Sequence, residues 1–129
     1  MAAFTFLDPE VVLAIHEEQL AAHGGSPGLR DRGLLDSALA RPANRVAYEP
    51  RADIAAVATA YAFGIVRNHP FVDGNKRTGF VAMELCLLLN GHGLEASDED
   101  CVMAMLQLAS GDTEEDQFAA WVRTHLERI

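Results

Sequence analysis

The most apolar stretch of this sequence runs from Gly79 to Leu89, and it is the strongest constraint on the fold. It belongs to a segment, 75–90, that carries apolar side chains on nearly every side of a helix: Phe80, Val81, Met83, Leu85, Cys86, Leu87, Leu88 and Leu89. A helix that is apolar all round is typical of the centre of a protein. The stretch is too short for a bilayer and contains Glu84, so we expect no membrane span. These features predict a central buried helix surrounded by other helices.

The N-terminal third begins with a clear helix signal. Residues 8–9, Asp-Pro, combine a side-chain cap with a residue suited to the first turn, and the two glycines at 24–25 predict the end of that helix. We expect Val11, Ile15 and Ala22 to share its buried face. The helix therefore precedes a loop that runs from Ser26 to Gly33.

A short helix and then an irregular segment are expected after this loop. A short helix is predicted from about Leu34 to Arg41, and Pro42 is expected to stop it. Residues 43–51 show no helical period, which predicts a loop or a small β-hairpin that acts as a flap.

Three further helices follow from capping residues. Asp53, Ser97 and Thr113 each precede a helical pattern, and acidic residues follow Ser97 and Thr113 at the positive end of the helix dipole. The expected buried residues are Ile54, Val57, Tyr61 and Ile65 in the first of these helices, and Phe118, Trp121, Val122 and Leu126 in the last. The sequence thus predicts an all-α bundle of about six helices in one domain, 1–129.

Charge and cysteine content limit the possible partners and location. The chain has 129 residues and a net charge of -9, and such an acidic surface repels nucleic-acid backbones and anionic membranes. We therefore expect a protein partner and no direct nucleic-acid or membrane binding. Cys86 and Cys101 do not form a disulfide framework, and residues 1–7 do not resemble a signal peptide. These observations predict a cytoplasmic protein with reduced cysteines.

The polar chemistry of the sequence is concentrated in one motif. Residues 69–80 read His-Pro-Phe-Val-Asp-Gly-Asn-Lys-Arg-Thr-Gly-Phe, directly before the apolar helix. Backbone N–H groups of Gly74, Asn75 and Lys76 are expected to point out of the start of that helix and to form an anion site. Gly74 allows a phosphate to approach the backbone, while Lys76 and Arg77 add positive charge. The motif therefore indicates phosphate binding.

Two further side chains of the motif suggest a reaction. Asp73 is its one carboxylate, and a carboxylate combined with phosphate oxygens and waters is a usual arrangement around Mg²⁺. His69 can take a proton from an attacking hydroxyl at neutral pH. Together, these groups are suited to phosphoryl or nucleotidyl transfer.

Each of these residues also has an ordinary structural interpretation. A single loop histidine is more often structural, Asp-Gly-Asn is a common turn, and adjacent basic residues usually lie on a solvated surface. Their occurrence together at the start of a buried helix favours a functional site. His16, in contrast, lacks the second histidine of a zinc-protease helix, so we expect it on an exposed face.

The motif resembles the signature of the Fic family, and more closely its Doc (death-on-curing) branch. The signature His-Pro-Phe-x-Asp/Glu-Gly-Asn-Gly-Arg-x-x-Arg is matched at His69, Pro70, Phe71, Asp73, Gly74, Asn75 and Arg77. The similarity extends upstream over residues 16–42. This resemblance implies an all-α Fic fold in which the motif joins two helices.

The resemblance also implies roles for individual residues. His69 is implied as the general base and Asp73 as the metal ligand. The loop at Gly74, Asn75 and Lys76 is implied as the anion site, with Arg77 on phosphate. The flap that positions the target is implied at about 44–48.

Two departures from the signature bear on which group is transferred. AMP-transferring Fic enzymes have a second glycine where this chain has Lys76, and a final arginine where it has Phe80. The Asn-Lys-Arg-Thr form is similar to the Doc branch, which implies a kinase that binds Mg²⁺ and ATP, phosphorylates a threonine of elongation factor Tu and arrests translation. Gly74, where Doc toxins often carry alanine, keeps AMP transfer open as an alternative.

The sequence also bears on how the activity of the protein is inhibited. No full self-inhibiting Ser/Thr-x-x-x-Glu-Gly/Asn sequence is found, because Glu115 follows the partial match at residues 110–114. The resemblance instead implies a toxin of a type II toxin–antitoxin system, silenced by a separate antitoxin that covers the site. A non-catalytic Fic-like binding module is the remaining alternative, although the intact motif argues against it.

Overall fold

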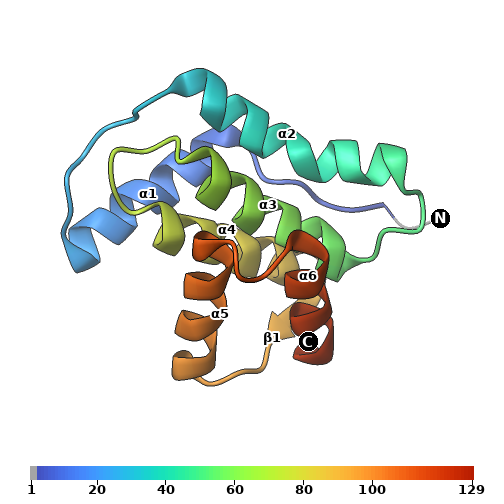
Figure 1. The fold of residues 1–129 in the computed structure, drawn as a ribbon. Coiled ribbons are helices and arrows are strands. Elements are labelled where there is room, and N and C mark those ends of the chain that lie inside the picture. The colour runs from blue at the N-terminus through green and yellow to red at the C-terminus, as the bar shows by residue number, and fades with distance from the viewer. Residues whose placement is uncertain (1–2) are drawn as a thin grey trace.

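The computed structural model describes residues 3–129. Met1 and Ala2 belong to the segment 1–7, which does not resemble a signal peptide, and they lie outside the described residues. Within residues 3–129, six helices and two short strands follow one another (Figure 1). Their bounds are α1 (Pro9–His23), α2 (Arg32–Tyr48), α3 (Ile54–Asn68), α4 (Asn75–Leu89), β1 (His92–Leu94), α5 (Asp98–Ser110), α6 (Glu115–Thr124) and β2 (Leu126–Arg128). The prediction of an all-α bundle of about six helices is confirmed.

The most deeply buried helix is α3, which contacts α2, α4, α5 and α6 (Figure 1). The predicted buried residues of this helix, Ile54, Val57, Tyr61 and Ile65, all lie in the core. Five alanines and a glycine between residues 55 and 64 leave little side-chain bulk, which allows neighbouring helices to approach closely.

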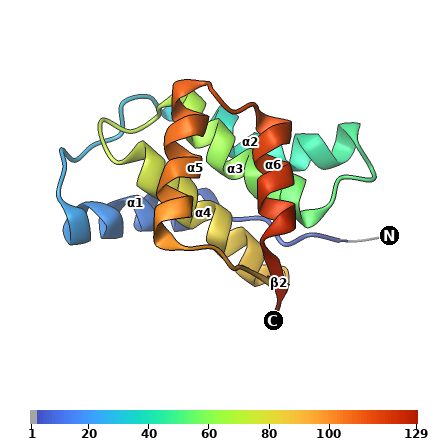
Figure 2. The same ribbon diagram turned by 60° about the horizontal axis from the view of Figure 1, so that its bottom comes forward.

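The prediction that α4 is the central helix, buried on all sides, was wrong. It buries residues such as Met83 and Leu87, but Leu88 is 54% exposed and Leu89 is 49% exposed. The second half of α4 lies at the edge of the bundle, because α5 and α6 pack on α3 and cover only part of α4 (Figure 2). Overall apolarity therefore did not identify the centre of the fold.

The α2 helix continues through the point where the sequence predicted its end. Pro42 lies inside this helix and is buried, and residues 43–48, expected to form a loop or β-hairpin flap, are helical. Ion pairs hold this second half: Arg45 binds both Glu115 and Asp116 of α6, at 3.2 and 2.8 Å. These contacts with α6 compensate for the backbone hydrogen bond that proline cannot donate.

Two of the four predicted side-chain caps were confirmed, whereas the side chain of Asp8, at the N-cap of α1, makes no capping hydrogen bond. Asp53 accepts a hydrogen bond from the Ala56 N–H at 3.0 Å, and Ser97 accepts one from the Asp100 N–H at 3.1 Å. The last helix begins one residue later than expected, with Glu114 and not Thr113 at the N-cap.

The buried face of α1 differs from the prediction. Val12, Ile15 and His16 are buried, whereas Val11 and Ala22 are exposed. The actual face follows the i, i+3, i+4 spacing of Val12, Ile15 and His16. The expectation that His16 lies on an exposed face was therefore wrong.

A two-stranded antiparallel sheet joins the end of α4 to the C-terminal segment. His92 pairs with Arg128, and Leu94 pairs with Leu126. Cys86 and Cys101 are both unpaired. No helix of the described residues has both the length and the apolar character needed to cross a membrane.

Candidate active site

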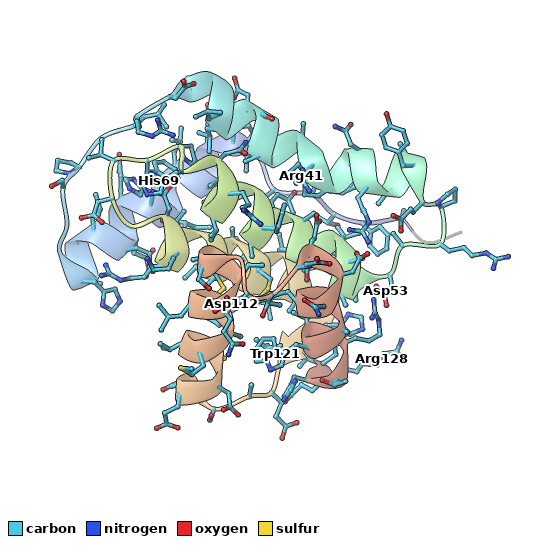
Figure 3. All side chains as sticks on the ribbon, in the orientation of Figure 1. Arg41, Asp53, His69, Asp112, Trp121 and Arg128 are labelled. Atoms are coloured by element: carbon cyan, nitrogen blue, oxygen red, sulfur yellow. The ribbon has the colours of Figure 1, made fainter. Side chains whose placement is uncertain are left out.

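The motif forms a tight loop between the end of α3 and the start of α4 (Figure 3). Phe71 anchors this loop in the core with 1% of its surface exposed. The Asn75 side chain closes the loop, because its amide accepts from the Phe71 N–H and donates to the Phe71 carbonyl, both at 3.0 Å. The amide of Asn75 is thus an internal brace, and only its backbone N–H is available to an anion.

His69 is exposed at the C-cap of α3. Its backbone is left-handed, with φ 52° and ψ 54°, and among the described residues it is the only non-glycine with a positive φ. Such a conformation costs an L-residue on the order of 1–2 kcal/mol. Strained backbone of this kind is often found at functional sites.

The start of α4 presents a set of free backbone donors. Gly74 is the N-cap at φ 80°, and the first bond of the helix runs from the Thr78 N–H to the Gly74 carbonyl. The N–H groups of Asn75, Lys76 and Arg77 precede that bond and have no acceptor within the helix. The Gly74 N–H, also expected to be free, instead donates to the Asp73 carboxylate at 2.8 Å, which corrects the predicted donor set.

The Asp73 carboxylate is exposed beside these donors. The backbone N–H groups of Ser26 and Gly74 donate to it at 3.2 and 2.8 Å, and they lower the pKa of Asp73 below its ordinary value. The carboxylate is therefore ionised at neutral pH. A Cβ on Gly25 would lie 2.9 Å from an Asp73 oxygen, so the close approach of this loop requires glycine there.

The donor chemistry at Asp73 fits a magnesium ion that is shared with phosphate. Mg²⁺ is commonly held by one or two carboxylates together with phosphate oxygens and waters. No group of three or more His, Cys, Asp and Glu side chains is gathered for a metal within residues 3–129. Asp73 is therefore a carboxylate that could supply one protein ligand to such an ion.

The segment from Gly24 to Asp31 runs along the outside of the motif loop. Leu29 and Phe71 form an isolated antiparallel bridge, and the Val72 N–H donates to the Gly28 carbonyl at 3.0 Å. The segment at 44–48, where the flap was expected, belongs to α2 and comes just before Asp53. Asp53 begins α3 and His69 ends it, so residues 44–48 are at the far end of α3 from His69 (Figure 3).

His16 on α1 supports the motif from the inside. The ring is 5% exposed, and its Nε2–H donates to the Asp73 carbonyl at 2.8 Å. It also stacks on Phe71, with ring centroids 3.8 Å apart and an interplanar angle of 9°. His16 therefore fixes the peptide between Asp73 and Gly74, and the sequence analysis missed this role.

Lys76 and Arg77 begin a groove between α1, α4 and α5. The groove has a volume of about 660 Å³, and its walls are mostly apolar beyond the two cations. Phe80, Val81, Leu94, Val102, Met105 and Leu106 line that apolar part. Lys76 and Arg77 thus lie in a largely apolar groove that also contains the carboxylates of Glu84 and Asp98.

Comparison with known proteins agrees with this geometry. The model of the Fic/DOC family matches residues 6–87, which include the whole motif. The chain belongs to the Fic/DOC family. A protein of Mycolicibacterium smegmatis (strain ATCC 700084 / mc(2)155), named Toxin Doc, is 41% identical over 122 residues, 89% of this chain and 88% of the relative. The Protein kinase doc of Escherichia phage P1 is 36% identical over 85 residues, 66% of this chain and 68% of the relative.

The Fic/DOC match confirms the family that the motif indicated. It also covers α1, which carries His16, and the segment 24–31 that supports the loop. The match ends within α4, so α5 and α6, including the α5 wall of the groove, lie beyond it. In this Fic/DOC domain the roles of the motif residues remain predictions, to which the geometry adds specific contacts. These residues are His69, Asp73, Gly74, Asn75, Lys76 and Arg77.

Proposed function

We propose that this protein is a Doc-type toxin kinase that transfers the γ-phosphoryl group of ATP to a threonine of elongation factor Tu. The observation that carries the proposal is the start of α4, where three free N–H groups adjoin the ionised Asp73 carboxylate. Phosphoryl transfer depends on positioning and on neutralising charge, which this arrangement supplies. The name of one relative, Protein kinase doc, supports phosphoryl transfer, and the name of the other, Toxin Doc, supports a toxin.

In the proposed reaction His69 acts as the general base. The imidazole takes the proton of the threonine hydroxyl, whose oxygen then bonds to the γ-phosphorus. The bond from that phosphorus to the β–γ bridging oxygen breaks, and ADP leaves. Backbone N–H groups of Asn75, Lys76 and Arg77, with the two side-chain cations, bind the phosphates.

Asp73 would hold Mg²⁺ at this site, where the ion supplies charge neutralisation of the phosphates. The hydrogen bonds to Ser26 and Gly74 keep the carboxylate ionised and orient it. His16 fixes the backbone on the other side of the same residue.

AMP transfer to a protein hydroxyl is the second candidate, and Gly74 is the observation that favours it. At φ 80° the position suits glycine, the residue that Fic-type AMP transferases have there. Lys76 and Phe80 favour the kinase, because a lysine crowds the anion site and a phenylalanine cannot bind a terminal phosphate.

The protein's partner and location follow from the proposed activity. A toxin that acts on elongation factor Tu works in the cytoplasm and requires a cognate antitoxin, which would cover the motif loop. A non-catalytic module, the third alternative, requires no intact His69.

Two radioactive labels separate these functions. Purified elongation factor Tu is incubated with the protein, magnesium and ATP labelled at either the γ- or the α-phosphate. The kinase predicts transfer of the γ-label only, and this transfer is abolished in His69→Ala. A matched control, His92→Ala in β1, should retain the activity, because His92 is remote from the motif. Transfer of the α-label would overturn the kinase in favour of AMP transfer.

A further inference from the structure

The direction of the His69 side chain depends on its backbone. None of the hydrogen bonds found within residues 3–129 involves the His69 imidazole, and the side chain is exposed. In the left-handed conformation the Cβ points in a different direction from that of a helical residue. Whatever holds φ at 52° therefore also aims the ring.

Arg30 binds this turn from its outer side through hydrogen bonds to backbone carbonyls. Its Nε–H donates to the His69 carbonyl at 2.7 Å, and its Nη2–H donates to the Asn68 carbonyl at 3.0 Å. The Arg30 backbone N–H donates to the Pro70 carbonyl at 2.7 Å. One residue thus binds three consecutive carbonyl groups, although it is 39 positions from His69 in the sequence.

The chemistry of arginine suits the end of a helix. The last carbonyls of α3 have no donor within the helix, and the C-terminal end of a helix attracts positive charge. The planar guanidinium reaches two carbonyls at once, which a lysine ammonium does with much less geometric control. These contacts offset the cost of the left-handed conformation at His69.

We propose that Arg30 is a positioning residue that holds the His69 backbone in its left-handed conformation and thereby aims the imidazole at the substrate hydroxyl. The proposal rests on the proposed function, because it takes His69 as the general base. We expect Arg30 itself to contact neither the phosphates nor the substrate hydroxyl, because its guanidinium binds backbone carbonyls.

Arg30→Met tests the proposal through a separation of kcat from KM. A displaced catalytic group lowers kcat, and we expect a decrease on the order of 10- to 100-fold. The KM for Mg-ATP should stay close to that of the wild type, because the free N–H groups of α4 are unchanged. A raised KM with an unchanged kcat would mean that Arg30 binds phosphate, which would overturn the proposal.

Two variants complete the kinetic comparison. Arg30→Lys keeps the charge but loses the two-point contact, so its kcat should fall between those of the wild type and Arg30→Met. If Arg30→Met does not fold, Arg30→Lys alone carries the test. Arg32→Met is the matched control, because Arg32 lies two residues away and pairs with the exposed Asp36. It should leave kcat unchanged.

Backbone chemical shifts provide a readout that does not depend on the reaction. In Arg30→Met the NMR shifts of residues 68–70 should move towards values for an unconstrained loop, while Arg32→Met leaves them in place. Unchanged shifts together with unchanged kcat would refute the role of Arg30. Active His69→Ala would refute His69 as the base instead, and the shifts would still report whether Arg30 holds the turn.

Discussion

At the residue scale, His16 is the least expected part of the site. Replacing it with phenylalanine keeps an aromatic ring against Phe71 but removes the N–H that binds the Asp73 carbonyl. We expect His16→Phe to lower the free energy of unfolding by about 1 kcal/mol, because a carbonyl loses its partner. We also expect a higher KM for Mg-ATP, since Asp73 and Gly74 lose their support. Urea unfolding and initial rates measure the two effects.

Glu17→Gln is the control for this prediction. Glu17 is the exposed neighbour of His16 on α1, so its substitution should leave both the stability and the KM unchanged. Equal effects of the two substitutions would mean that His16 acts only through general helix stability.

The residues of the site differ in how far the sequence could reveal them. Residues 69–77 were recognisable because the chemistry is contiguous and its meaning depends on local spacing. His16 and Arg30 reach the motif across 57 and 39 positions, and no local pattern marks such contacts. The one sequence signal for a buried histidine was helical spacing, because Val12, Ile15 and His16 lie on one face of α1.

At the element scale, the approach of α2 to α3 depends on Gly64. A Cβ at this position would lie 2.9 Å from Arg41 Cδ and 3.1 Å from the Ala38 carbonyl oxygen. Gly64→Ala should therefore cost about 1–3 kcal/mol in the free energy of unfolding, despite the better helix propensity of alanine. Thermal and urea unfolding measure the loss.

Gly79→Ala is the matched comparison in α4. Its added Cβ would lie 3.3 Å from the Ala62 carbonyl oxygen and 3.4 Å from Val66 Cγ2, which is less severe. We expect a smaller loss than for Gly64→Ala. The reverse order would contradict the close packing of α2 on α3.

The start of α3 predicts a dependence of stability on pH. The hydrogen bond from Arg123, with a further one from the Ala56 N–H, lowers the pKa of Asp53. The ionised carboxylate therefore stabilises the fold above its unfolded pKa of about 3.9, and this contribution is lost as the pH falls through the lower, folded pKa.

Substitution of Asp53 tests both parts of this interaction. Asp53→Ala should lower the free energy of unfolding at pH 7 by about 1 kcal/mol, because the helix loses its cap. Asp53→Asn keeps a capping oxygen and should lose less. Both variants should show a weaker fall in stability between pH 5 and 3 than the wild type, as urea titrations at each pH can measure; an equal fall would contradict the prediction.

Sequence patterns predicted where most helices begin but not how they pack. The caps of α3 and α5 were correct because capping is local chemistry. Pro42 does not stop α2, because α6 stabilises the second half of that helix through Arg45. The alanine-rich α3, not the more bulky α4, is central, because small residues favour close contact with many neighbours.

At the scale of the whole molecule, Tyr61 connects the N-terminal segment to the central helix. The Leu7 N–H donates to the Tyr61 hydroxyl at 2.8 Å, and burial raises the pKa of Tyr61 to about 12. Neutral Tyr61 stabilises the fold fully below its unfolded pKa of about 10, and this contribution is lost as the pH rises through about 12.

Tyr61→Phe should cost about 1–3 kcal/mol at neutral pH, because a buried N–H loses its acceptor. It should also remove much of the alkaline loss of stability. Tyr48→Phe is the control, since Tyr48 is 87% exposed and its removal should change neither quantity. An alkaline transition that is identical in all three proteins would refute the role of Tyr61.

The charge of the molecule and the position of its site favour a protein substrate. The net charge of -9 disfavours the binding of nucleic acid. The cations Lys76 and Arg77 lie beside the free N–H groups at the start of α4. An acidic protein with one small cationic site can bind nucleotide phosphates without attracting nucleic acid. This distribution agrees with a Fic/DOC protein that modifies another protein.

The mass of intact elongation factor Tu after reaction tests the central claim most directly. The protein is incubated with elongation factor Tu and Mg-ATP, and the target is analysed by mass spectrometry and fragmentation. We expect the addition of a single phosphoryl group on a threonine, absent with His69→Ala and present with His92→Ala. Addition of an AMP group, or an unchanged mass, would contradict it.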